Sequence, residues 1–309
     1  MTAAYRLMGV INATPDSFSD GGRFLDADAA VAHGRELLAA GADILDVGGE
    51  STRPGAEPVA VEQEIERTGP VVAGLAGAGA QISIDTSKLA VAEVALREGA
   101  TLVNDVTAFR ADPGLAGLVA DSGADCCLMH MLGEPRTMQV EPTYGDVVSE
   151  VKSFLEERLS FAVSEGVAEE RVLLDPGIGF GKTAAHNLEL LRRLPELVAI
   201  GRPLVIGTSR KTFLGRIAAA AREGAEIESV EPLPPGERLA GTIATNVLAL
   251  ERGASVFRVH DVAAVRDALA VAAATLGPRW TPRSPATTAR TSTTTASTTK
   301  TRESRAPSR

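Results

Sequence analysis

Short apolar runs alternate with longer amphipathic stretches from residue 5 to about residue 275, and the alternation repeats about eight times. The short runs are apolar on both faces, as buried parallel strands are. A strand followed by a helix throughout the chain is typical of a parallel α/β fold. The expected strands are Leu7–Ile11, Asp43–Val47, Gln81–Ile84, Thr101–Val103, Cys126–Met129, Arg171–Leu174, Pro203–Ile206 and Ser255–Val259.

The amphipathic stretches predict helices between these strands. Several of them end in Gly just before the next strand, as helix C-termini do. The expected helices include Ala27–Ala40, Glu57–Leu75, Ser87–Glu98, Val147–Glu165, Ala184–Leu194, Glu237–Arg252 and Asp261–Ala274.

Polar, Gly-rich or charged motifs follow almost every expected strand, which decides between two parallel folds. An open doubly wound sheet would concentrate its ligand signals at one switch point. In a (β/α)₈ barrel the carboxyl ends of all eight strands converge on one face, so motifs after every strand form one composite site. We therefore predict a (β/α)₈ TIM barrel, a single domain over residues 1–280, with its active site at that face.

Two segments lie outside this pattern. Residues 223–236 are rich in acidic residues and Pro, and we expect a solvated loop in the seventh βα unit. Residues 281–309 are Thr, Ser, Pro, Ala and Arg with almost no apolar side chains, which predicts a disordered C-terminal tail. The Thr/Ser-rich composition favours an inert extension over a binding role for the basic tail.

Charge and composition narrow the class of partner. The net charge is −9 over 309 residues, and because the tail contributes +5 the remaining body carries −14. An acidic body with 4% aromatic residues argues against nucleic-acid binding. The longest apolar stretches are too short for a membrane span, and the N-terminus does not resemble a signal peptide. Cys126 and Cys127 are adjacent in an apolar run and predict a buried, reduced pair, so we expect a cytoplasmic protein.

Four polar side chains are expected at the ends of four different strands: Asp85, Asn104, Asp175 and Lys211. Any one Asp or Asn could simply cap the next helix. Together, two carboxylates and a carboxamide aimed into one apolar cavity are costly to desolvate unless a ligand hydrogen-bonds to them. A heterocycle with several N–H donors fits this set.

Basic side chains gather on the same face of the expected barrel. They are Arg53, Arg210, Lys211, Arg258 and His260, all at strand ends rather than on helix exteriors. This combination predicts an anionic substrate, a phosphate or diphosphate, to which Arg offers bidentate contacts. Asn12 and Asp20 could supply oxygen ligands for Mg²⁺, which usually takes one or two protein groups plus substrate phosphates.

The Gly-rich run from Gly177 to Thr183 does not match either common phosphate motif. Three residues separate its first Gly from the Gly-Lys pair, whereas a P-loop needs four, and the glycines do not have dinucleotide-fingerprint spacing. What remains is Asp175 at a strand end followed by a backbone that can approach a flat ligand closely.

The motifs taken together resemble the dihydropteroate synthase family. They are MGVINATPDSFSDGG, DVGGESTRPG, ISIDTSK, NDV, MHM, DPGIGFGK, GTSRKTFLG and FRVHDV, in order from residue 8 to residue 262. The resemblance covers essentially the whole expected barrel. It implies a (β/α)₈ enzyme that condenses 6-hydroxymethyl-7,8-dihydropterin diphosphate with p-aminobenzoate, releasing diphosphate and forming dihydropteroate, with sulfonamides competing for the aminobenzoate site. It also implies a homodimer.

The resemblance assigns roles to positions of this chain. The implied pterin residues are Asp85, Asn104, Val106, Met129, Asp175, Gly207 and Lys211; the diphosphate residues are Thr52, Arg53, Arg258 and His260; the p-aminobenzoate residues are Phe18, Pro54, Phe180, Lys211 and Thr212; and the magnesium residues are Asn12 and Asp20. The residues expected to act in catalysis are Asp20, Arg53, Asp85, Asp175, Lys211 and Arg258.

One departure from the family pattern is visible at Thr212, where many relatives carry Ser; the hydroxyl is retained. Two other functions stay open at this point. A pterin-dependent methyltransferase on the same barrel would have little use for the TPDSFSDGG loop. A catalytically silent, pterin-binding paralogue would be expected to lose Phe18, Asp20 or Arg53, and all three are present.

Overall fold

The structure is a computed structural model that describes residues 5–14, 23–51, 55–133 and 137–277, with the side chains of residues 23–26 excluded. Its centre is a parallel sheet of eight strands in the order β6-β5-β4-β3-β2-β1-β8-β7. A bridge between Leu174 and Leu204 joins the two ends of this sheet and closes it into a barrel. The strands are β1 (Arg6–Asn12), β2 (Ile44–Gly48), β3 (Gln81–Asp85), β4 (Leu102–Asp105), β5 (Asp125–Met129), β6 (Val172–Asp175), β7 (Val205–Ile206) and β8 (Val256–Val259).

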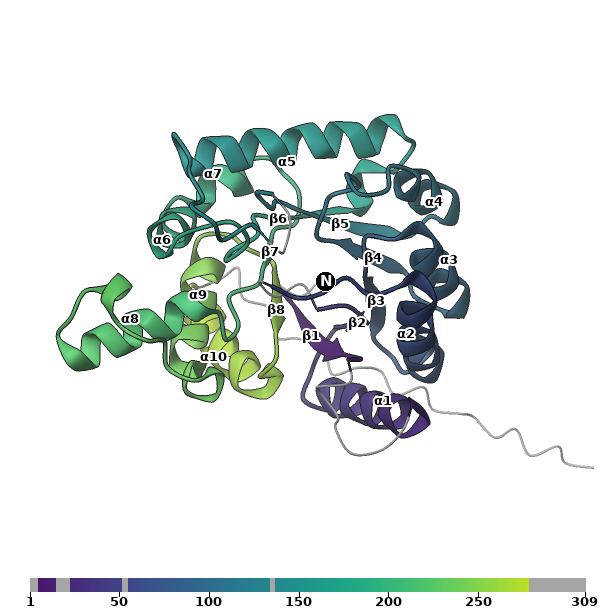
Figure 1. Ribbon diagram of the computed structural model, residues 1–309, viewed down its shortest axis with the longest axis horizontal. Coiled ribbons are helices and arrows are strands. Elements are labelled where there is room, and N and C mark those ends of the chain that lie inside the picture. Colours follow the sequence, from purple (N-terminus) through teal and green to yellow (C-terminus); the bar gives the residue numbers. More distant parts are fainter. Residues whose placement is uncertain (1–4, 15–22, 52–54, 134–136, 278–309) are drawn as a thin grey trace, which may run out of the picture.

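Helices surround the strands on the outside of the barrel (Figure 1). Most of the expected helices are present within a few residues of their predicted ends, and so is the predicted strand-helix alternation. The α-helices are α1 (Arg23–Ala39), α2 (Val61–Leu75), α3 (Leu89–Glu98), α4 (Gly114–Ser122), α5 (Val147–Ser164), α6 (Ala184–Arg192), α7 (Leu194–Val198), α8 (Thr212–Glu223), α9 (Leu239–Glu251) and α10 (Val262–Thr275).

Local sequence signals set several helix ends. Asp146 caps α5, because its side chain accepts a hydrogen bond of 2.7 Å from the Ser149 backbone N–H. Thr183 and His186 form a reciprocal capping box at the start of α6. Gly99 ends α3 in the left-handed conformation, with φ of 116°, where a side chain would be strained.

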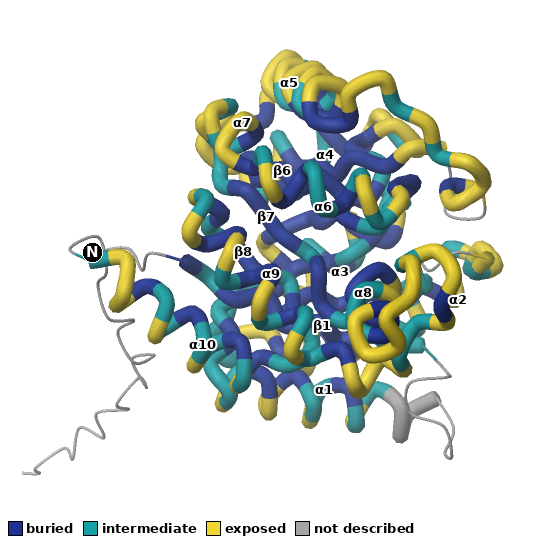
Figure 2. Tube along the Cα trace, turned by 90° about the vertical axis from the view of Figure 1, so that its left-hand side faces the viewer, coloured by how far each residue is buried: buried dark blue, intermediate teal, exposed yellow. Residues whose placement is uncertain are grey.

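The hydrophobic core lies mainly between the strands and the ring of helices, and the helix faces that point outward are exposed (Figure 2). A separate apolar cluster fills the inside of the barrel. Its members come from seven of the eight strands: Met8, Ile44, Leu102, Cys127, Leu173, Val205 and Val256. Both cysteines are buried and free, as expected.

The segment 223–236 is mostly exposed, as its composition predicted, but part of it is helical and one residue is buried. It contains the short 3₁₀ helices η3 (Ile227–Ser229) and η4 (Pro235–Glu237). Val230 is buried and packs against Ala219 and Ala220 of α8, with Leu233 beside them. Scattered apolar residues are enough to pin this segment to its neighbouring helix. The 281–309 tail lies outside the described residues, so its disorder stays a prediction.

Candidate active site

The carboxyl ends of the strands bring the expected polar side chains to one level of the barrel. Asp85 lies opposite Gly48 on one neighbouring strand and opposite Asn104 on the other. Met129 lies opposite Asp175 in the same way. Because the strands are parallel, these side chains lie at the same mouth of the barrel. Asn104 and Asp175 are both buried, with 6% exposure each.

Arg258 joins several of these groups from β8. Its Nε donates to Asp46 Oδ2 at 2.7 Å, and its Nη2 donates to Asp85 Oδ2 at 2.7 Å. Its third nitrogen, Nη1, has no hydrogen-bond acceptor among the described residues, so it can donate to an anion. The Arg258 guanidinium is therefore held in place by two carboxylates, and its Nη1 remains free to donate to a ligand.

Asp46 is a site residue that the sequence reasoning missed. It is fully buried on β2 and accepts hydrogen bonds from Ser83 Oγ at 2.6 Å, from Arg258 and from Asn104 Nδ2 at 3.1 Å. Because the amide nitrogen of Asn104 is used by Asp46, its Oδ1 is the atom left as an acceptor for a ligand. The signal was an acidic residue inside an otherwise apolar strand, two positions after Ile44 on the same face.

Burial sets the protonation of the acidic groups. Burial raises the pKa of Asp85 to about 7; Arg258 opposes the shift, and the neighbouring carboxylates, Asp46 first, add to it. Burial also raises the pKa of Asp175, against the backbone N–H of Gly177 and the cations Lys211 and Arg258. A ligand with N–H donors would satisfy both carboxylates and favour their ionised form.

The basic groups are shifted by the same environment. The pKa of Lys211 is lowered to about 8. Burial is the main cause and nearby Arg258 adds to the shift, while Asp175 and Asp85 oppose it. Burial alone would lower the pKa of Arg258, but Asp46 and Asp85 outweigh it and the pKa lies above its ordinary value. Arg258 is thus a permanent cation, whereas Lys211 titrates near neutral pH.

An apolar wall stands beside the charged groups. Val106, Met129, Met131 and Met138 form a small buried cluster, and the Phe180 ring packs against it. The Lys211 ammonium lies 4.0 Å from the centroid of that ring, a cation–π contact. The wall offers a flat, polarisable surface that suits an aromatic ring system.

Gly207 and His260 complete the set of predicted residues that the structure describes around this mouth. A Cβ at Gly207 would stand 4.0 Å from both Asp175 Oδ2 and the Arg258 Cβ, so the chain passes closely over that pair. His260 is fixed by Ser209, whose Oγ accepts from the His260 backbone N–H at 3.1 Å and lies 3.0 Å from its Nδ1. Ser209 was not predicted.

The other predicted residues either make no hydrogen bond or ion pair with this polar group or lie outside the part of the chain that the structure describes. Asn12 ends β1 opposite Gly48, half-buried, and Thr212 is exposed at the start of α8. Arg210, expected on the site face, instead forms a two-pronged ion pair with Asp261 at 2.6 and 2.9 Å. The remaining predicted residues, Phe18, Asp20, Thr52, Arg53 and Pro54, lie outside the described residues.

The segment that carries residues 52–54 is held at both of its flanks. Lys88, which follows β3, donates to the Glu50 carboxylate before the segment and to the Val59 carbonyl after it, the latter at 2.6 Å. The same ammonium donates to the buried Glu64 of α2 at 2.6 Å. One lysine therefore ties both flanks to the barrel wall.

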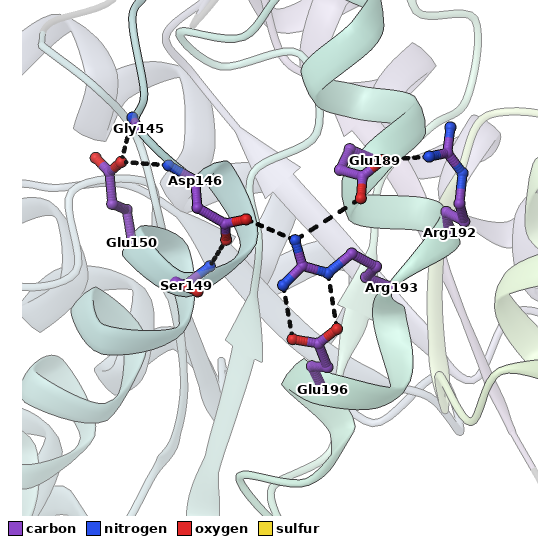
Figure 3. A network of polar contacts seen from close by, with 8 residues as sticks. All are labelled: Gly145, Asp146, Ser149, Glu150, Glu189, Arg192, Arg193 and Glu196. Carbon is purple, nitrogen blue, oxygen red and sulfur yellow. Dashed lines mark hydrogen bonds and ion pairs between the residues drawn. The ribbon is translucent and has the colours of Figure 1, made fainter.

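A second polar network lies away from the strand ends, between α5, α6 and α7 (Figure 3). Arg193 donates to Asp146 at 2.7 Å and to both oxygens of Glu196 at 2.7 and 2.9 Å. A hollow of about 420 Å³ adjoins this network. Because Arg193 is already matched by carboxylates, the network joins helices and offers no strong anion site.

Known proteins resemble this chain in sequence over most of its length. Residues 8–260 match the family model described as Pterin binding enzyme. The chain is 48% identical over 276 residues to dihydropteroate synthase of Mycobacterium leprae, covering 89% of this chain and 94% of that one. The chain belongs to the dihydropteroate synthase family.

Solved structures of the family have the same fold. The synthase of Xanthomonas albilineans with 4-aminobenzoic acid is 45% identical, with a TM-score of 0.78, covering 88% of this chain and 93% of that chain. Another structure of that organism's synthase, in complex with 7,8-dihydropteroate, has a TM-score of 0.74 at 43% identity, with coverages of 88% and 94%. The Yersinia pestis synthase in a sulfonamide drug complex has a TM-score of 0.79 at 40% identity, with the same coverages. The predicted family and barrel are both confirmed.

Proposed function

We propose that this chain condenses 6-hydroxymethyl-7,8-dihydropterin diphosphate with p-aminobenzoate to form 7,8-dihydropteroate and diphosphate, a step of folate biosynthesis. The observation that carries the proposal is the group of acceptors and cations at the barrel mouth. Asp85, Asn104 and Asp175 offer acceptors, and Arg258 and Lys211 offer positive charge beside them. Relatives named dihydropteroate synthase match this chain over nearly their whole length.

The pterin is expected between the carboxylates and the apolar wall. Its amino-pyrimidinone edge presents parallel N–H donors, which match a carboxylate such as that of Asp175. Val106 and Met129 supply a flat contact surface on one side of this slot, and Gly207 leaves room for a ring because it has no side chain. We expect Asn104 Oδ1 to accept another donor of the same ring.

The diphosphate is expected beside Arg258 and His260. Arg258 Nη1 can donate to a phosphate oxygen while Nε remains bonded to Asp46 and Nη2 to Asp85. Thr52 and Arg53 are assigned here by the family motif. The positive charge of Arg258 stabilises the developing charge of the leaving group.

Mg²⁺ is proposed at Asn12 and Asp20. The amide oxygen of Asn12 lies at the mouth end of β1, and oxygen donors suit this cation. Among the described residues, no three His, Cys, Asp or Glu side chains gather into a metal-binding group. One or two protein oxygens together with substrate phosphates would complete such a site. Bound there, the ion would neutralise charge on the diphosphate.

The proposed reaction is a dissociative substitution. The bond between the pterin methylene carbon and the diphosphate oxygen breaks, and the electron pair leaves with diphosphate. The neutral amine nitrogen of p-aminobenzoate then bonds to that carbon and loses a proton. Asp85 and Asp175 favour positive charge on the pterin, and Phe180, Lys211 and Thr212, with Phe18 and Pro54 by family motif, hold the second substrate.

A two-substrate assay tests this function. The wild-type chain with pterin diphosphate, p-aminobenzoate and Mg²⁺ should release diphosphate and form dihydropteroate, and a sulfonamide should compete with p-aminobenzoate. Pterin binding without product would indicate a silent paralogue. Methyl transfer to or from a pterin, with no condensation, would indicate the methyltransferase alternative.

Assembly and location remain predictions. We expect a homodimer formed through the outer helices, which sedimentation at micromolar concentration would test, and a cytoplasmic location, which cell fractionation would test. Among the described residues, no helix combines the length and apolar character that crossing a bilayer requires.

A further inference from the structure

Lys182 is a basic residue buried inside the protein that the proposed reaction does not use. It follows the Gly-rich turn after β6, and only 3% of the residue is exposed. Lysines are almost never fully buried without a partner, because removing an ammonium from water is costly. Its position therefore calls for a specific role.

The Lys182 side-chain nitrogen has two hydrogen-bond partners among the described residues. It donates to the Phe180 carbonyl oxygen at 3.0 Å and lies 2.9 Å from His130 Nδ1. Burial lowers the pKa of Lys182 to about 7, although Asp175 opposes the shift. In its ammonium form Lys182 has donors and no acceptor, so His130 Nδ1 accepts from it and the proton of the neutral His130 ring is on Nε2. Burial, Lys182 and Arg110 lower the pKa of His130 to about 3, which agrees with this assignment.

His130 is itself fixed from several sides. Its backbone N–H donates to the Asp175 carbonyl at 2.9 Å, and its ring packs edge-on against Phe154 of α5 with centroids 4.8 Å apart. A Cβ at Gly177 would stand 1.8 Å from the His130 carbonyl oxygen, so the turn lies directly against this residue. Lys182 is thus bonded to a residue that directly follows β5 and is itself held in place by its neighbours.

The turn above this pair carries Phe180. Two other side chains hold the turn: Gln139 Nε2 donates to the Gly179 carbonyl at 2.6 Å, and the Tyr144 hydroxyl donates to the Gly181 carbonyl at 2.8 Å. These two carbonyls belong to the residues on either side of Phe180, and Lys182 donates to the carbonyl of Phe180 itself. Together these bonds fix the backbone on which the Phe180 ring stands, 4.0 Å from the Lys211 ammonium.

We propose that Lys182, braced by His130, is a positioning residue that holds Phe180 against Lys211 and so shapes the site of the second substrate. The inference rests on the proposed function, in which Phe180 contacts p-aminobenzoate. Lys182 acts through the Phe180 backbone and touches no reacting atom. Binding of the first substrate is expected to depend on it far less, because Asp175 keeps the stronger charges of Lys211 and Arg258 beside it.

Steady-state kinetics of Lys182→Met test the inference. The methionine fills the same space without donors, and we expect the KM for p-aminobenzoate to rise about tenfold while the KM for pterin diphosphate changes less than about threefold. Lys152→Met is the matched control, since Lys152 is a partly exposed lysine of α5 that forms an ion pair with Glu156, away from Phe180 and Lys211. It should leave both constants unchanged.

A double-mutant cycle with Phe180→Ala separates positioning from a general structural effect. If Lys182 acts through Phe180, then Lys182→Met should change the KM for p-aminobenzoate less than about twofold in the Phe180→Ala background. A merely structural role would give the same tenfold loss in both backgrounds. That additive result would overturn the inference.

A second variant keeps the test decisive if Lys182→Met does not fold. His130→Phe retains an aromatic ring against Phe154 and removes the acceptor for Lys182, and it should raise the KM for p-aminobenzoate about threefold with little change for the pterin substrate. An equal rise in both constants, or no rise in either variant, would contradict the inference. Absence of product from the wild-type chain would instead refute the proposed function itself.

Discussion

Leu173 and Asp175 point into the barrel from the same strand, two residues apart, yet their surroundings have little in common. Leu173 belongs to an apolar cluster with side chains from six other strands, whereas Asp175 ends the strand among cations and other polar groups. The same step from apolar to polar separates Leu102 from Asn104, and Val256 from Arg258. The barrel interior therefore has a lower apolar layer and an upper polar layer.

The two layers are stabilised in different ways. The lower layer lost its water on folding and gained close packing, about 25 cal/mol for each Å² of apolar surface buried. The upper layer lost water from charged groups, and the raised pKa of Asp85 and lowered pKa of Lys211 show that this cost is only partly repaid inside the protein. A ligand with matching donors and charges supplies the rest. This difference separates residues that hold the barrel from residues that act in it.

The largest expected effect comes from Arg258→Ala. Its loss removes the guanidinium proposed for the diphosphate, so pterin diphosphate should bind about 100-fold more weakly while the unphosphorylated pterin alcohol weakens about tenfold or less. Val256→Ala, one layer below, should lower the free energy of unfolding by about 1–3 kcal/mol and leave both affinities unchanged. Calorimetry with the two ligands and chemical unfolding measure these changes. Equal weakening of both ligands would mean that Arg258 only supports the pterin slot.

Asp46→Asn should have an intermediate effect. The substitution keeps the shape but removes the charge that holds Arg258 Nε, so diphosphate affinity should fall about tenfold. Ser83→Ala is the matched control, because it removes a different hydrogen bond to Asp46 and leaves those from Arg258 and Asn104 intact. We expect Ser83→Ala to change affinity less than about threefold. A larger loss of diphosphate affinity in Ser83→Ala than in Asp46→Asn would show that Asp46 does not position Arg258.

The pH profile should show the upper layer titrating. The pKa of Asp85 is raised to about 7, so below that pH the carboxyl is protonated and loses an acceptor. The pKa of Lys211 is lowered to about 8, so above that pH the side chain loses its charge. Hence kcat/KM for pterin diphosphate should be greatest between those two values and fall on both sides. Lys211→Arg should remove the alkaline limb, and a profile flat down to pH 5 would contradict the assignment.

Thr212→Ser should have the smallest effect. The hydroxyl is retained, and the side chain is exposed at the start of α8. We expect the KM for p-aminobenzoate to change less than about twofold, because the substitution removes only one methyl group from an exposed side chain. Steady-state kinetics check this, and a change of tenfold would show that the methyl group packs in the pocket.

Sequence reasoning recovered the barrel because both of its signals are local. Buried strands are short apolar runs, and helices that cover a sheet repeat their apolar positions every three to four residues. Sequence reasoning was less reliable for contacts between elements that are not neighbours within one local pattern. The segment 223–236 is mostly exposed, as its acidic and Pro-rich composition predicts, but that composition gives no sign that Val230 is buried against α8.

The site was recovered in part for the same reason. Asp85, Asn104 and Asp175 were found because each lies at or next to the end of its strand, and the structure places them at one mouth. Asp46 lies inside its strand and is defined by partners far along the chain, Arg258 being 212 residues away. The Lys182–His130 pair joins two loops that sequence spacing does not relate.

Asp175→Asn and Leu173→Ala, measured for both pterin affinity and stability, test the division between the two layers most directly. Asp175→Asn presents an amide donor to the donor edge of the pterin, so affinity for the pterin alcohol should fall at least about tenfold with little loss of stability. Leu173→Ala should lower the free energy of unfolding by about 2–5 kcal/mol and keep wild-type affinity. Wild-type pterin affinity in Asp175→Asn would contradict the account and remove the upper layer from the site.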